Sequence, residues 1–123
     1  MIRGKIIVGR GPVIELVIRG PDGSELDVDA VIDTGFTGAL TLPNAIVAGL
    51  GLEFDSRTDL ALGDGTLHTF DLHIAEVLWD GQWRTVLASA LGDEVLVGMR
   101  MLSRHRMMIE AVPGGPVEIV ALP

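Results

Sequence analysis

The residues best suited to chemistry in this chain are Asp33, Thr34 and Gly35. They follow an apolar run at residues 30–32, and apolar sequence resumes at Ala39. A carboxylate at the end of a buried strand is costly unless another group satisfies it, and a carboxylate can also act as a general acid or base. Because Asp, Thr and Gly are ordinary turn-forming residues, the tripeptide alone is weak evidence and its setting must decide.

Two carboxylates in contact can hydrolyse a peptide bond without a metal ion or a covalent nucleophile. One carboxylate acts as the base that activates water, and the other as the acid that protonates the carbonyl oxygen. Both cannot be ionised at such short range, so the pair shares one proton and titrates as a unit. The chain contains one Asp-Thr-Gly, so this chemistry requires a second copy of Asp33.

Other familiar chemistries lack their residues. His68 and His73 are separated by an odd number of positions, so on a strand their side chains point to opposite faces, and we expect no metal site there. The segment at residues 8–13 lacks the third glycine of a dinucleotide-binding loop. The chain has no cysteine, which excludes disulfides and thiolate metal sites. We therefore expect no cofactor.

Length and charge narrow the class of protein. The 123 residues fit a single domain spanning residues 1–123. The net charge of −8 argues against nucleic acid or an anionic membrane surface as a partner. No segment approaches the roughly 18 apolar residues that cross a bilayer, and the N-terminal segment lacks the apolar core of a signal peptide. We expect a soluble, cytoplasmic protein.

The elements that must position Asp33 are short strands. Turn-forming residues recur at intervals of about ten residues, which favours an all-β barrel or sandwich. Residues 25–32 alternate polar and apolar and then end in two apolar residues, as expected for a strand whose end is buried on both faces. The patterns predict about eight to ten strands and one or two short helices. The strands are expected at residues 2–8, 13–19, 25–32, 39–42, 60–62, 66–79, 84–90, 105–111 and 117–120, and a helix at residues 43–49.

Three segments follow one another along the chain in an order that is typical of one protein family. They are Val31-Ile32-Asp33-Thr34-Gly35, the turn Gly63-Asp64-Gly65, and Leu96-Val97-Gly98 before residues 99–103. In this order they resemble the retropepsin-like aspartic protease family, which has an aliphatic pair before Asp-Thr-Gly, a hairpin flap, and an aliphatic pair before glycine and a short helix. The match is closest to small single-domain bacterial members, in which an aromatic residue and a segment like Thr-Leu-Pro follow the tripeptide.

The resemblance implies an aspartic endopeptidase with an all-β fold, a closed acid-protease barrel of six to ten strands with one or two short helices. It implies a homodimer in which the two copies of Asp33 meet at a two-fold axis, because the chain is too short for the two-lobed form of the family. Thr34 would bond to the loop of the other subunit, and Gly35 would let the substrate backbone approach. The turn at residues 63–65 would cover a bound peptide or protein substrate.

Phe36 departs from the family pattern, because many members carry Ala or Ser at this position. The ring either lines a substrate pocket or packs in the core or the dimer seam. The alternative function is a retropepsin fold without catalysis, acting as a dimerisation or peptide-binding module, and a third is an unrelated small β-barrel that binds an apolar ligand. Residues 2–8 and 117–120 are the expected dimer contacts. Arg100, Arg104, His105 and Arg106 form a small basic cluster, which is expected on a solvated strand face; the alternative is an anion contact or an ion pair across the dimer.

Overall fold

The computed structural model describes residues 1–61 and 64–123, and in this part of the chain it contains ten strands and two short helices. The all-β prediction with one or two helices is therefore confirmed. Most strands lie within a few residues of their expected positions, but the fifth strand begins at Glu53 rather than at residue 60. The strands are β1 (Ile2–Ile7), β2 (Gly11–Arg19), β3 (Glu25–Ile32), β4 (Leu40–Leu42), β5 (Glu53–Ala61), β6 (Leu67–Trp79), β7 (Gln82–Ala90), β8 (Val95–Val97), β9 (His105–Ile109) and β10 (Pro116–Ala121), and the helices are α1 (Asn44–Gly49) and α2 (Met99–Leu102).

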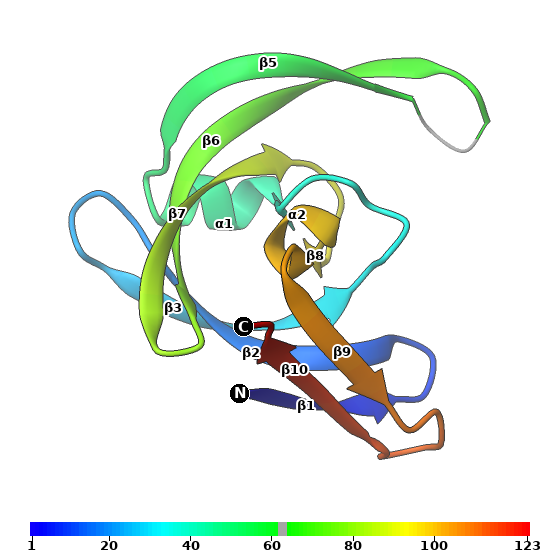
Figure 1. The fold of residues 1–123 in the computed structure, drawn as a ribbon. Coiled ribbons are helices and arrows are strands. Elements are labelled where there is room, and N and C mark those ends of the chain that lie inside the picture. The colour runs from blue at the N-terminus through cyan, green and yellow to red at the C-terminus, as the bar shows by residue number, and fades with distance from the viewer. Residues whose placement is uncertain (62–63) are drawn as a thin grey trace.

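Six of the strands form a closed ring of hydrogen-bonded neighbours. The sheet runs in the order β5-β6-β7-β4-β8-β3-β2-β1-β10-β9, and β2 also pairs with β6. This extra pairing joins β2, β3, β8, β4, β7 and β6 into a ring. Beyond the ring, β5 extends the sheet past β6, while β1, β10 and β9 extend it past β2 (Figure 1).

The core fills this ring because the strands alternate in polarity. On β2, Ile14, Leu16 and Ile18 are buried while Glu15 between them is exposed. The end of β3 is buried at both Val31 and Ile32, as its consecutive apolar residues predict. The last residues of β3 therefore lie inside the protein, and the chain leaves the core at the following residue.

The strands β3 and β4 lie on opposite sides of β8. Ile32 on β3 pairs with Val97 in parallel, and Leu40 on β4 pairs with the same Val97 in antiparallel fashion. Two strands that are neighbours in sequence are therefore separated by a strand that comes more than fifty residues later. The loop at residues 33–39 must cross the end of β8, and we call it the Asp loop.

The residues at the turns explain why two pairs of strands form hairpins. Asp80 and Gly81 join β6 to β7 and both have positive φ, 51° and 81°, which is the backbone that Asp-Gly favours in a two-residue hairpin. The longer β5–β6 hairpin arches over the side of the molecule that carries α2 and the Asp loop (Figure 1).

No helix in the described ranges has the length and apolar character needed to cross a bilayer.

The two ends of the chain pair with each other. Ile2 on β1 lies opposite Ile119 on β10, so the termini lie close together (Figure 1). Strand β1 is bonded to both β2 and β10, and β10 to both β1 and β9. In the described part of the chain each terminal strand is therefore paired on both sides, and the edge strand at this end of the sheet is β9. The expectation that residues 2–8 and 117–120 contact a second subunit stays a prediction.

Candidate active site

Asp33 is the first residue of the Asp loop, and its position is set by three hydrogen bonds. Its backbone N–H donates to the Val97 carbonyl at 2.9 Å, and its own carbonyl accepts from the Phe36 N–H at 3.1 Å. The carboxylate oxygen Oδ1 accepts the Gly35 N–H at 2.9 Å. Strand β8 therefore fixes the backbone of Asp33, and the turn itself holds the carboxylate in place.

The rest of the Asp loop is bonded to the start of α2. The Gly98 N–H donates to the Ala39 carbonyl at 3.0 Å, and the Met99 N–H to the Phe36 carbonyl at 2.8 Å. The Arg100 N–H reaches the Gly38 carbonyl at 3.2 Å. The segment predicted from Leu96-Val97-Gly98 and a short helix is therefore the support on which the Asp loop rests.

A glycine is required at position 98 because the Asp loop passes directly over it. A Cβ there would lie 2.5 Å from Cδ2 of Phe36 and 2.7 Å from the Phe36 carbonyl oxygen, and closer still to the Gly38 carbonyl oxygen. Distances under about 3 Å cannot be accommodated without movement of the loop. The absence of a side chain at Gly98 therefore lets the Asp loop take the position that it has over α2.

Thr41 is a second support, and the sequence analysis did not identify it. This residue of β4 is buried, and its hydroxyl accepts the Leu96 N–H at 3.2 Å and donates to the Glu94 carbonyl at 3.4 Å. The hydroxyl thus ties the beginning of β8 to β4. The only sequence signal for it is a polar residue between two leucines that are themselves buried.

Asp33 is one of the residues that line a hollow of about 500 Å³. Asp33 is half-buried, while Thr34 and Gly35 are exposed, so the loop presents its polar atoms toward solvent. The hollow also contains Arg10 and Glu94, whose side chains form an ion pair at 3.3 Å. The remaining lining residues are mostly apolar and include Pro12, Val31, Ile32, Leu96, Met107 and Ile109.

A second hollow, of about 430 Å³, lies between the Asp loop, the middle of the β5–β6 hairpin, and β7. Phe36 lines it, and the ring also covers Gly38 and Gly98. Both roles considered for this side chain, pocket wall and packing, are therefore compatible with its position. Arg84 of β7 and Arg100 of α2 line the same hollow. Arg100 lies on a helix, so its expected place on a strand face was wrong.

The predicted flap turn lies in the β5–β6 connection. The Asp64 carboxylate accepts the Thr66 hydroxyl at 2.6 Å and the Thr66 N–H at 2.9 Å, and these bonds hold the pKa of the Asp64 carboxyl below its ordinary value. Gly65 follows with a positive φ of 83°, and Gly63 lies outside the described residues. Asp64 and Gly65 line neither of the two hollows above.

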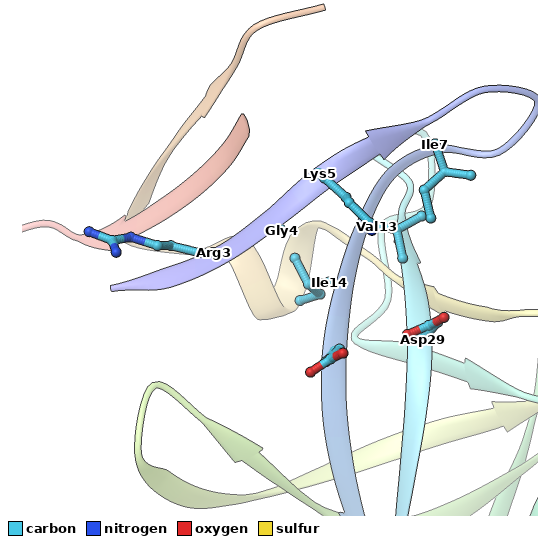
Figure 2. A pocket seen from close by; sticks show the side chains of 8 residues that line it. Arg3, Gly4, Lys5, Ile7, Val13, Ile14 and Asp29 are labelled. Carbon is cyan, nitrogen blue, oxygen red and sulfur yellow. The ribbon is translucent and has the colours of Figure 1, made fainter. Parts of the chain in front are cut away.

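A further hollow, of about 370 Å³, lies along β1 and β2 (Figure 2). Its lining carries both charges, from Arg3 and Lys5 of β1, Glu15 of β2 and Asp29 of β3. In Figure 2 the Arg3 side chain points away from the other labelled side chains. None of the lining residues belongs to the Asp loop, so this hollow is not part of the candidate active site.

Comparison with known proteins bears on the fold. No protein-family model and no curated protein sequence matches the chain. Among solved structures, the chain is similar to a retropepsin-like aspartic protease from Rickettsia conorii, with a TM-score of 0.50 and 17% sequence identity over 89% of this chain and 94% of that one. This similarity shows that the chain has the retropepsin-like fold.

Proposed function

We propose that the protein is an aspartic endopeptidase that works as a homodimer. The observation that carries the proposal is the Asp33 carboxylate, which accepts the Gly35 N–H and lines a hollow. The loop that bears it is bonded to β8 and α2 at several points. A carboxylate on a loop so fixed is pre-positioned for acid–base chemistry.

The proposed reaction uses two copies of Asp33 that share one proton. The unprotonated carboxylate takes a proton from water as the water oxygen attacks the peptide carbonyl carbon. The protonated carboxyl gives its proton to the carbonyl oxygen, which forms a neutral tetrahedral diol. When the C–N bond breaks, the carboxyl that took the proton from water gives it to the amine nitrogen. One diol hydroxyl gives its proton to the other carboxylate and becomes the carbonyl of the new carboxyl group, which restores the single shared proton.

The neighbouring residues have supporting roles in this proposal. Thr34 is exposed beside Asp33, where its hydroxyl could form a hydrogen bond with the Asp loop of a second subunit. Gly35 is also exposed, and a Cβ on it would meet Oδ1 of Asp33 at 3.2 Å, so a side chain would crowd the carboxylate. The β5–β6 hairpin, with Asp64 and Gly65 in its connection, would lie over an extended peptide and bond to its main chain.

The test is Asp33→Asn, which keeps the shape of the side chain but removes its acid–base chemistry. We expect cleavage of a denatured protein substrate or a peptide library to fall by a factor of about 10³ or more. Asp27→Asn is the matched control, because Asp27 is exposed on the same strand that leads to Asp33. It should retain full activity.

Two results would contradict the proposal. If cleavage survives in Asp33→Asn, then Asp33 takes no part in the reaction. If the wild-type dimer binds peptides but turns none over at any pH, the protein is a binding module that has the fold without the catalysis.

A further inference from the structure

The hollow between the Asp loop and the β5–β6 hairpin has an unusual charge for this protein. The chain has 17 acidic and 9 basic residues, yet the charged side chains among the described residues that line this hollow are Arg84 and Arg100, with no carboxylate among them. The other lining residues are apolar or neutral, such as Phe36, Leu72 and Thr58. The hollow is thus a small positive site on an acidic protein.

The two arginines are held close to the same element. Arg84 is half-buried, and its Nη1 donates to the Met101 carbonyl of α2 at 3.4 Å. Arg100 is exposed on α2, next to Met101 in sequence. Within residues 1–61 and 64–123, neither guanidinium forms an ion pair, whereas Arg10, Arg19 and Arg57 each pair with a carboxylate.

A guanidinium in a partly enclosed hollow favours a carboxylate as its partner. The planar group can donate two parallel hydrogen bonds to the two carboxylate oxygens. Because Arg84 already gives one N–H to a backbone carbonyl, its orientation is restricted and less conformational entropy is lost on binding. The apolar wall of Phe36 and Leu72 would contact the methylene groups of an acidic side chain.

We propose that this hollow is a substrate subsite that selects an aspartate or glutamate side chain of the bound peptide. The inference rests on the proposed function, because it takes the Asp loop as the place where the peptide lies. Phe36 of the hollow is three positions after Asp33 in the same loop. The acidic residue therefore occupies a position near the scissile bond.

The test compares peptides that differ by one carboxylate. A set of N-acetylated, C-amidated decapeptides carries a single Glu at each position in turn, with a matched set carrying Gln. Binding to Asp33→Asn is measured by fluorescence anisotropy, and cleavage by the wild type as kcat/KM. At one position we expect the Glu peptide to bind and to be cleaved about tenfold better than the Gln peptide, and the preference should shrink as salt is raised.

Substitution of the arginines should remove this preference. We expect Arg84→Gln/Arg100→Gln to bring the Glu-to-Gln ratio to about one, measured on the same preparation of the variant. Arg104→Gln is the matched control, because Arg104 is an exposed arginine close in sequence that does not line the hollow, and it should keep the tenfold ratio. Arg100→Glu should prefer a Lys peptide over the Glu peptide, a gain that an unfolded variant cannot show.

The outcomes separate this inference from the proposed function. Equal binding of the Glu and Gln peptides at every position, or no binding of either, overturns the acidic subsite even when the wild type cleaves them. A preference for Glu that survives in Arg84→Gln/Arg100→Gln also overturns it. A Glu preference that depends on the arginines, without cleavage, would support the subsite and contradict the protease.

Discussion

Phe36 is coupled to two glycines that are far apart in sequence. The three atoms nearest to a Cβ at Gly38 would all belong to the Phe36 ring, the closest at 2.6 and 2.8 Å, whereas a Cβ at Gly98 would also meet two backbone carbonyl oxygens. A ring can turn away at modest cost, but a carbonyl oxygen moves only if the loop moves. The large aromatic side chain after Asp-Thr-Gly is therefore accommodated because both positions beneath it lack a side chain.

This difference predicts how the substitutions combine. We expect Gly38→Ala to destabilise the protein by about 1 kcal/mol and Gly98→Ala by about 3 kcal/mol. In a Phe36→Ala background the Gly38→Ala cost should vanish while most of the Gly98→Ala cost persists, because a Cβ at Gly98 would still meet two backbone carbonyl oxygens. Urea denaturation of the single and double variants measures the coupling.

Gly49→Ala is the control for these glycine substitutions. Gly49 lies in α1, and nothing approaches within 4 Å of the place where its Cβ would be. Alanine should be neutral or stabilising there, because it favours helix over glycine. Equal costs for Gly38→Ala with and without Phe36 would show that the ring does not explain the conflict.

At this scale, local sequence reveals only part of the site. Asp33 could be found because its tripeptide, the flanking apolar residues and Leu96-Val97-Gly98 all carry a local pattern. The roles of Thr41 and Arg84 could not, since each depends on a contact with a residue far along the chain: Leu96 for Thr41, and Met101 for Arg84. A polar residue in an apolar segment gives no sign of which distant N–H or carbonyl it will meet.

Among the elements, the β5–β6 hairpin was the least visible in the sequence. Strand β5 begins at Glu53, but its first half is polar apart from Phe54, and Glu53, Phe54 and Asp55 are all exposed. Without a buried face there is no alternation of polar and apolar residues to read. The turn residues in the connection predicted the hairpin, and the pairing with β6 sets its length.

The connection of this hairpin carries a pH-dependent contact. The Thr66 hydroxyl and N–H hold the pKa of the Asp64 carboxyl below its ordinary value, so the ionised carboxylate favours the folded turn. That contribution is complete above about pH 4, where the carboxyl is ionised even in the unfolded chain, and is lost as pH falls through the lowered pKa. The turn should therefore loosen in strong acid.

Amide exchange at Thr66 measures this effect. After correction for the intrinsic pH dependence of exchange, we expect protection of the Thr66 N–H to decrease as pH falls below about 4. Asp64→Ala should lose this protection at every pH. Asp22→Ala is the control, because the same pair of bonds joins Asp22 to Ser24 in a different turn, and it should leave Thr66 unchanged.

For the whole molecule, the position of the free sheet edges bears on the proposed dimer. Strand β9 is the last strand of the sheet, with β10 on one side and no partner on the other among the described residues. Ile109 and Met108 on this strand are exposed, and Ile109 also borders the hollow that contains Asp33. An unpaired, partly apolar edge next to the candidate catalytic group is where a second copy would bring the two loops together.

This placement predicts that a charge on β9 blocks assembly. We expect Ile109→Lys to weaken self-association about tenfold or more by sedimentation velocity, and to lower peptidase activity in proportion to the fraction of dimer. Leu26→Lys is the matched control, because Leu26 is 37% exposed against 36% for Ile109 but lies on β3. A fully dimeric Ile109→Lys would place the interface elsewhere on the molecule.

The crossing of the Asp loop over β8 also has a consequence for biosynthesis. Val97 of β8 pairs with both Ile32 of β3 and Leu40 of β4. A nascent chain that has just emerged past residue 42 therefore contains Asp33, but it does not yet contain β8, the strand that lies between β3 and β4. Contacts of such long sequence separation form late. A ribosome-bound intermediate would therefore lack the native geometry of the Asp loop, which forms only after about four-fifths of the polypeptide has been translated.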